Sequence, residues 1–234
     1  MTITTTPLPA QEDWSLDRQA LPDFLVLFAA MHDAMRRDAA RLERAIRDVA
    51  PEQPAVLALR AWWQRYADVI VHHHHREDEL VWPALEARAP EFAAAQAPLH
   101  VDHDALDLAM SAVDTALAAM AARPEADEVR RGATDAAAAF RSLLLDHLRR
   151  EESLAFPLLA RTYTAEEYEA LEQQMRKGSS LRQIAFEVPW VLDEAGPRVL
   201  ALADEAVPAI MRALLRLSWT RRYRRVAGPV REVA

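Results

Sequence analysis

Four long segments of this sequence repeat apolar residues at alternating intervals of three and four positions. That period matches one face of an α-helix, so each segment predicts a helix with a single apolar stripe. Prolines mark the breaks between the segments, and the connections are short. Four helices of this kind are typical of an up-and-down antiparallel bundle in an all-α protein. The segments span about residues 22–49, 54–88, 99–122 and 125–161.

The composition agrees with an all-α fold. Only 4 of the 234 residues are glycine, which leaves few positions for the tight turns and bulges of many-stranded folds. The hydrophobic share of 51% is enough for a core of ordinary size. The chain contains no cysteine, which excludes disulfides, thiolate metal sites, iron–sulfur clusters and cysteine nucleophiles.

We expect three regions along the chain: an N-terminal arm at 1–20, the bundle at 21–162 and a C-terminal helical extension at 163–234. The extension predicts additional helices at about 165–177, 180–194 and 198–219. Thr164 with Glu167, and Ser180 with Gln183, have the spacing of capping boxes at helix starts. Pro83 and Pro157 lie near the ends of the second and fourth long helices, where we expect each to kink or end its helix.

Histidine is confined to one part of the chain, since all eight lie between positions 32 and 147. Each of the four apolar stripes contains one histidine, and two stripes add a glutamate one helical turn later. Burying these groups would be unfavourable unless they were hydrogen-bonded or bound a metal. Imidazole and carboxylate together suit iron, manganese or zinc. The candidate metal ligands are His32, His73, Glu77, His103, His147 and Glu151.

A short internal repeat selects the pair in the second helix from a run of four histidines. Residues 73–85 (HHHREDELVWPAL) align without a gap with residues 147–159 (HLRREESLAFPLL). The alignment favours His73 with Glu77. His74 with Asp78 also lies on an apolar stripe, so that register remains an alternative. The remaining histidines are interpreted as solvated side chains or as supporting residues around the ligands: His72, His74, His75 and His100.

This arrangement of His32, His73-x3-Glu77, His103 and His147-x3-Glu151 resembles the hemerythrin-like HHE cation-binding domain over about residues 21–162. The resemblance implies a non-haem di-iron centre with two Fe per chain. It also implies that the four histidines are terminal ligands and the two glutamates bridge the irons. Members of this family bind dioxygen, sense oxygen, iron or nitric oxide, or decompose peroxide.

The sequence departs from oxygen-carrying hemerythrins at two positions. Asp107 stands where they have a second histidine on the third helix, and the last helix has His147-x3-Glu151 instead of His-x4-Asp. Six protein ligands in place of seven imply that one iron is more open, which favours reaction with peroxide over reversible oxygen carriage. Asp107 is the candidate for handling protons near the centre or for completing its ligands.

The first hypothesis is therefore a redox-active di-iron protein that binds dioxygen or reacts with peroxide; as an enzyme it would be a catalase-like oxidoreductase. The second is a sensor of oxygen, nitric oxide or iron that reports to a protein partner through 163–234. A metal-free bundle with structural histidines is the third. Excess negative charge, −8 overall, argues against general nucleic-acid binding.

The sequence also bears on the location and on the C-terminal end. No unbroken apolar run approaches the length of a membrane span, and the first residues lack the pattern of a secretory signal, so we expect a cytoplasmic protein. The end of the chain is basic around Trp219 and Tyr223. It is read as a solvated helix end, as a helix docked on the acidic bundle, or as a surface for an anionic partner. Its charges are Arg221, Arg222, Arg224 and Arg225.

Overall fold

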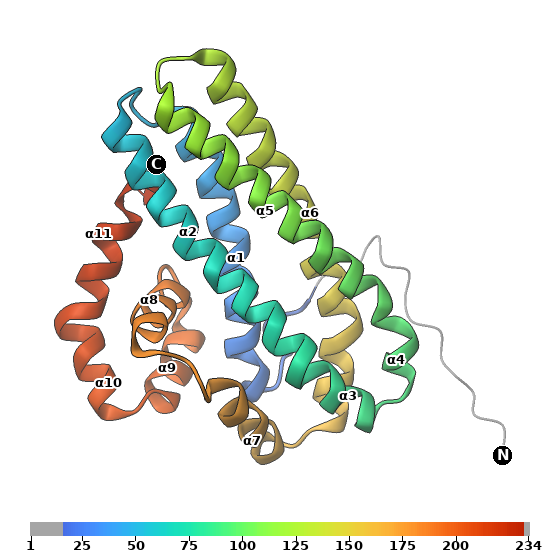
Figure 1. The fold of residues 1–234 in the computed structure, drawn as a ribbon. Coiled ribbons are helices and arrows are strands. Elements are labelled where there is room, and N and C mark those ends of the chain that lie inside the picture. The colour runs from blue at the N-terminus through green and yellow to red at the C-terminus, as the bar shows by residue number, and fades with distance from the viewer. Residues whose placement is uncertain (1–15, 232–234) are drawn as a thin grey trace.

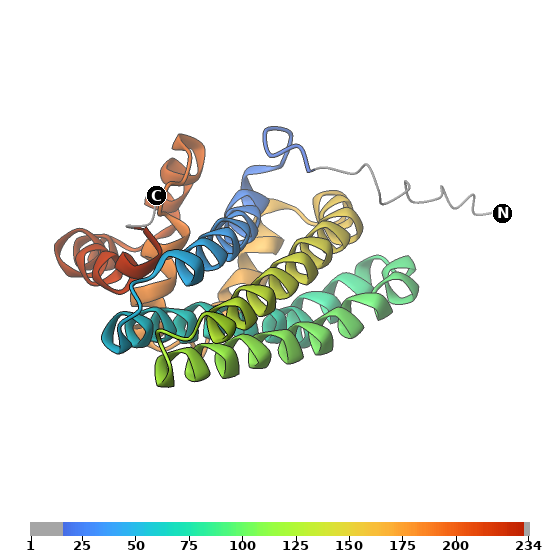
Figure 2. The same cartoon turned by 90° about the horizontal axis from the view of Figure 1, so that it is seen from above.

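A computed structural model describes residues 16–231, which form helices joined by short connections without any strand. Four long helical stretches run alternately up and down beside one another, and shorter helices pack along one side of them (Figures 1 and 2). The all-α bundle with additional C-terminal helices is confirmed. The bundle consists of α1 (Asp23–Asp48), α2 (Gln53–Arg76) with its continuation α3 (Trp82–Arg88), α5 (Ala97–Ala122) and α6 (Asp127–Thr162).

The second long helix contains a wider, π-helical turn, η2 (Glu77–Val81), between α2 and α3. The backbone N–H of Glu77 is shared between the carbonyl oxygens of His73 and His74. Pro83 has no N–H to donate to the carbonyl four residues earlier, which accounts for the irregular hydrogen bonding just before it. The helix then continues to Arg88. Pro157, by contrast, lies inside α6, which extends beyond it to Thr162.

Two separate apolar clusters fill the bundle. One surrounds the large rings of Trp62, Trp63 and Phe140, and the other contains Trp82 and Phe156. The buried histidines and glutamates lie between these clusters along the helices, so the polar site forms a layer across an otherwise apolar core. In α6, Leu143 is 41% exposed, whereas Leu144, one residue further on, is buried.

The N-terminal arm predicted for 1–20 lies outside the described residues as far as position 15; residues 16–22 lead into α1 without regular helix. α4 (Glu91–Ala95) connects α3 to α5. Both capping boxes of the extension are present, at Thr164 and Ser180. The last predicted helix, 198–219, is interrupted at Pro208 and resumes. The extension comprises α7 (Ala165–Arg176), α8 (Leu181–Val191), α9 (Pro197–Ala206), α10 (Ala209–Leu214), a π-helical turn η3 (Leu215–Trp219) and α11 (Thr220–Arg231).

A buried polar network attaches the extension to α1. The indole N–H of the fully buried Trp190 donates to Asp38 Oδ2 at 2.6 Å. Arg41 joins Asp38 to Asp193, at 2.8 and 3.0 Å. The hydroxyl of Tyr223 donates to the same Asp193 carboxylate at 3.0 Å. Because each of these charges has a partner, the junction between bundle and extension can be buried without isolated ions.

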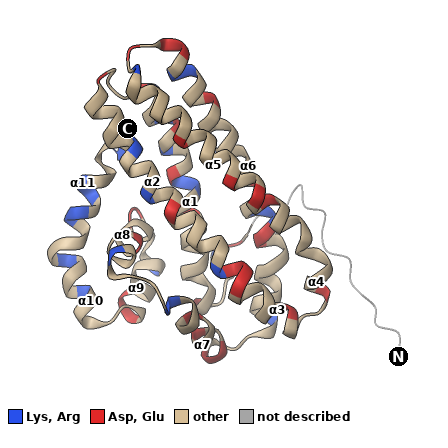
Figure 3. Cartoon of the chain, viewed as in Figure 1, with Lys and Arg blue, Asp and Glu red and all other residues tan. Residues whose placement is uncertain are grey.

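The basic end of the chain forms α11, which packs against α1 and α2. Its buried face consists of Tyr223, Ala227 and Val230. The arginines of the sequence RRYRR (221–225) are exposed on the opposite side, where basic residues recur along the helix (Figure 3). The helix therefore packs through apolar residues and keeps these four arginines in solvent, whereas Arg231 at its end donates to Asp193 at 2.6 Å.

Helix α5 is long and apolar enough to cross a membrane, judged by length and composition alone. The core helix of a bundle meets the same criterion. Here α5 contacts α2 and α6 and buries Leu99, Leu106, Val113 and Leu117 against them.

Candidate metal centre

All six predicted ligands converge at one level of the bundle. His32 comes from α1, His73 from the end of α2, Glu77 from the start of η2 and His103 from α5. α6 contributes His147 and Glu151, and His74 of α2 joins the set from next to His73. Every one of these side chains is buried. Their polar atoms form two overlapping groups in which all candidate ligand atoms lie within 4.8 Å of one another.

The two-histidine group consists of His32 and His73 with both glutamates. The Nε2 atoms of the two histidines are 3.0 Å apart, so these nitrogens point at each other. Glu77 Oε1 lies 2.7 Å from His73 Nε2, and Glu151 Oε1 lies 3.4 Å from His32 Nε2.

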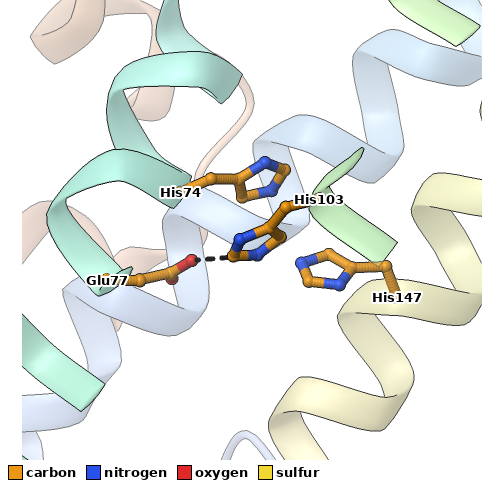
Figure 4. A group of neighbouring side chains, drawn as sticks. All are labelled: His74, Glu77, His103 and His147. Carbon is orange, nitrogen blue, oxygen red and sulfur yellow. Dashed lines mark ion pairs between the residues drawn. The ribbon is translucent and has the colours of Figure 1, made fainter. Parts of the chain in front are cut away.

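The three-histidine group consists of His74, His103 and His147 with Glu77 (Figure 4). The rings of His74 and His103 are stacked, with centroids 4.1 Å apart. The second oxygen of each glutamate faces this group. Glu77 Oε2 is 4.0 Å from His103 Nε2, and Glu151 Oε2 is 3.4 Å from His147 Nε2. Each glutamate thus presents one oxygen to each group.

Three further carboxylates face the opposite nitrogens of the histidine rings. Glu152 lies 3.0 Å from His32 Nδ1, Asp78 lies 2.9 Å from His103 Nδ1, and Asp102 lies 3.5 Å from His147 Nδ1. An ionised carboxylate can only accept, so the facing Nδ1 carries the hydrogen and Nε2 keeps its lone pair toward the centre. Carboxylates in this position orient histidine ligands of metal sites.

Arginines hold two of these supporting carboxylates. Glu152 Oε1 accepts from Arg18 at 2.9 Å and from Arg36 at 2.7 Å, and Asp102 is paired with Arg150. Burial opposes the charge of Glu152, but His32 and Arg36 lower its pKa well below the usual value. Despite burial, His147 and Arg150 likewise lower the pKa of Asp102. These carboxylates are therefore ionised acceptors at neutral pH.

The histidines themselves are mostly held neutral. Burial, followed by the neighbouring imidazoles, lowers the pKa of His73, His74 and His103. Burial also favours the neutral form of His147, but the carboxylates of Asp102 and Glu151, 3.5 and 3.4 Å from its ring nitrogens, outweigh burial and raise the pKa of His147. A neutral imidazole is the form that binds a metal.

The two glutamates differ in their surroundings. Burial and the facing Glu151 carboxylate raise the pKa of Glu77 well above its usual value. Burial acts in the same direction on Glu151, but His32, His147 and His73 lower the pKa of Glu151 to about 2. Glu151 is therefore the more readily ionised of the two glutamates, and Glu77 the less readily ionised.

The donor set fits a metal centre. Within the described chain, both oxygens of Glu77 and of Glu151 are buried without a hydrogen-bond partner, as are the Nε2 atoms of His74, His103 and His147. Buried polar atoms are normally hydrogen-bonded, so this concentration of unpartnered atoms at one point requires an explanation. Metal ions coordinated by these nitrogens and oxygens would satisfy them, and the mixed imidazole and carboxylate set suits iron, manganese or zinc.

Two sequence interpretations need correction at the site. His74, interpreted as a solvated or supporting residue, is 4% exposed and belongs to the three-histidine group. Consecutive helical residues differ by about 100° in direction, so His73 and His74 reach different groups on the two sides of Glu77. Asp107, the candidate for proton handling, is exposed, because Leu106 occupies the buried position on that turn of α5.

The supporting carboxylates were missed by sequence reasoning, although the repeat contained a signal for two of them. Asp78 and Glu152 are the same position of the repeat, one residue after each glutamate. Both accept from a histidine on a neighbouring helix. Asp78 therefore contacts His103, and it belongs to neither the two-histidine nor the three-histidine group. His72, His75 and His100 remain outside both groups, as the sequence indicated.

Comparisons with known proteins agree with this geometry. A family model described as the hemerythrin HHE cation-binding domain matches residues 23–159, more than half of the chain. The chain is also similar to "Zinc finger protein BRUTUS" of Arabidopsis thaliana, with 24% identity over 187 residues. That alignment covers 79% of this chain but only 14% of the plant protein. No solved structure matches the chain significantly.

Proposed function

The chain belongs to the hemerythrin HHE cation-binding domain family, and from this membership and the site geometry we propose that it is a non-haem di-iron protein that binds dioxygen or reacts with peroxide. The proposed ligands are His32 and His73 for one iron and His74, His103 and His147 for the other. Glu77 and Glu151, which face both histidine groups, would help to hold both irons. His74 is added to the ligands expected from the sequence, which brings the protein ligands to seven.

One observation carries this proposal: each buried glutamate directs its two oxygens to different histidine groups. Glu77 faces His73 with Oε1 and His103 with Oε2. Glu151 faces His32 with Oε1 and His147 with Oε2. A single metal would need only one such group. Two carboxylates that each span two groups are the arrangement of a bridged two-metal site in a helical bundle.

Bound iron would supply a redox-active Lewis acid at this point of the core. The chain's own residues do the rest of the work. Glu152, Asp78 and Asp102 fix the rings of His32, His103 and His147. The two apolar clusters cover this layer on either side, and His73 and Glu77 line a cavity beside it.

Metal analysis tests the proposal on the full chain, purified without a metal-affinity column. About two iron atoms per chain are expected, as in carboxylate-bridged sites of helical bundles. His73→Ala should lose iron while its circular dichroism stays helical. His75→Ala, an exposed histidine two residues further along the chain, serves as the matched control and should keep its iron. Zinc in place of iron, a single metal per chain, or unchanged iron in His73→Ala would contradict the di-iron assignment.

A second candidate function, a sensor of oxygen, nitric oxide or iron, is favoured by one feature of the fold. Helices α7 to α10 of the extension line the same cavity as His73 and Glu77. A change of ligands at His73 or Glu77 would alter the contacts of these helices, which lie outside the family domain. The same helices would bind the protein partner. Steady-state peroxide turnover separates the two functions, because a sensor has no need to turn over. Altered hydrogen exchange in 163–231 on iron loading, without turnover, would favour the sensor.

A further inference from the structure

A chamber of about 600 Å³ lies between the bundle and the extension. The residues that line it come from α1, α2 and η2 on one side and from α7, α8, α9 and α10 on the other. His73 and Glu77 are part of the bundle wall. The volume falls in the range of about 300–1,000 Å³ that is usual for small-molecule sites, and it is far larger than a diatomic ligand or peroxide requires.

The chamber wall is mainly apolar on both sides. The bundle contributes Phe28 and Met31, and the extension contributes Val188, Val191, Ala203 and Met211. The ring of Phe28 also contacts the rings of His32 and His73, with centroids 5.0 and 5.5 Å away. An apolar molecule in this chamber would therefore touch the residue that packs directly against the two-histidine group.

The chamber wall also carries charged and polar side chains, which could bind the polar end of a ligand. The guanidinium of Arg76 donates to Ser179 Oγ and lies 3.7 Å from Glu187 Oε1. Arg176 pairs with Glu172 on the same wall, at 3.3 Å. The guanidinium charge is permanent, whereas burial raises the pKa of both Glu172 and Glu187. Arg76 lies 3.7 Å from its nearest carboxylate, Glu187, and beside the Ser179 hydroxyl, so a carboxylate in the chamber would find a guanidinium and a hydroxyl to accept from.

We propose that this chamber binds an amphipathic carboxylate of fatty-acid size, with its apolar chain among the helices of the extension and its carboxylate at Arg76 and Ser179. The apolar walls suit the hydrocarbon chain of such a molecule, and the volume is large enough to hold it. The permanent positive charge of Arg76 suits the carboxylate. The site goes beyond the proposed di-iron function and does not depend on it, since its walls and its arginines are complete in the protein without metal.

Binding is tested on the metal-free full chain with palmitate, which displaces the fluorescent dye anilinonaphthalene sulfonate from the chamber. Ala203→Phe fills the cavity from α9, where Ala203 is 5% exposed. It should weaken palmitate at least about tenfold, which corresponds to 1.4 kcal/mol. Ala201→Phe, on the exposed side of the same helix, is the matched control and should bind as the unaltered protein does. Absence of displaceable dye, or equal palmitate affinity in both variants, would overturn the proposal.

A second variant tests the anionic end. Arg76→Gln should weaken palmitate about tenfold and leave hexadecanol, which has the same chain without the charge, nearly unchanged. Arg65→Gln, on the same helix but outside the chamber wall, is the control. If hexadecanol binds as tightly as palmitate to the unaltered protein, or if Arg76→Gln affects both equally, the carboxylate assignment is wrong. Because no metal is present, these outcomes are independent of the iron measurements.

Discussion

The two histidine groups of the centre share their glutamates but differ in their surroundings. The two-histidine group has fewer nitrogen donors, and its His73 belongs to the chamber wall. The three-histidine group is built from α2, α5 and α6, and none of its histidines lies on that wall. The group with fewer protein ligands is thus the one beside the cavity, so under the proposed function an external ligand would reach the centre from the α1 and α2 side.

The largest expected effect comes from removing a residue that both groups share. Glu151→Ala should release most of the metal from both positions, because each position loses one carboxylate oxygen and Glu77 is the one shared carboxylate left. Metal content after dialysis measures the effect. Glu79→Ala, an exposed glutamate in the same region as Glu77, should keep its iron. Retention of one tightly held metal by Glu151→Ala would show that the groups are independent sites.

A histidine substitution in each group should give unequal results. His32→Ala leaves a single histidine in the two-histidine group, and the protein should fall to about one iron per chain. His103→Ala leaves two histidines in its group and should keep more iron under the same conditions. Competition with a chelator ranks the two variants. If His103→Ala loses metal first, the three-histidine group is the weaker one and the comparison is reversed.

Each supporting carboxylate should affect the metal affinity of one histidine group. Glu152→Gln removes the anionic partner of His32, and Asp78→Asn removes that of His103. Such partners contribute about 10- to 100-fold to metal affinity. Chelator titration should therefore show one weakened metal in each variant, with the other unchanged. Loss of both metals in either variant would mean that the groups are more strongly coupled than their separate partners indicate.

The smallest effect is expected at the ion pair between Arg60 of α2 and Asp114 of α5, at 2.8 Å, which does not contact either group. Arg60 lowers the pKa of Asp114. Its contribution to stability is therefore present above the unfolded-state value of about 3.9 and is lost as the pH falls through the lowered folded pKa. Both side chains are about a third exposed and screened by solvent, so Asp114→Asn should cost at most ~1 kcal/mol at pH 7.

Urea unfolding at several pH values checks this last expectation. The variant and the unaltered protein should converge in the acid range, and iron content should be the same in both. A variant that also loses iron would show that distant contacts between α2 and α5 position the three-histidine group.

The sequence predicted the bundle and most of the centre because both follow from helical phase. A residue four positions from another lies on nearly the same face, so His73 with Glu77 and His147 with Glu151 could be paired without a structure. The same reasoning allowed only one of His73 and His74 to be a ligand, because adjacent residues lie on different faces of a helix. It could not show that two adjacent helices approach from both sides of α2 and that both histidines are consequently buried.

The periodicity of apolar residues could not predict contacts between helices that are distant in the chain. The hydrogen bond of Glu152 to His32 joins residues 120 positions apart, and that of Trp190 to Asp38 spans 152. The extension shows the same limit. Its capping boxes are local and were predicted, whereas the chamber it forms with α1 and α2 depends on packing. The region boundaries and the cytoplasmic location stay predictions.

The supporting carboxylates also make the two halves of the bundle depend on each other. Asp78, next to α2, orients His103 of α5, while Glu152 of α6 orients His32 of α1. Each helical hairpin therefore holds a histidine of the other in position, in a reciprocal exchange across the interface. Both ligand groups combine residues of the two hairpins, since Glu151 of α6 belongs to the two-histidine group and His103 of α5 and His147 of α6 belong to the three-histidine group. Separation of the hairpins would lose the free energy of metal binding as well as that of packing. Bound metal should therefore stabilise the whole bundle against unfolding.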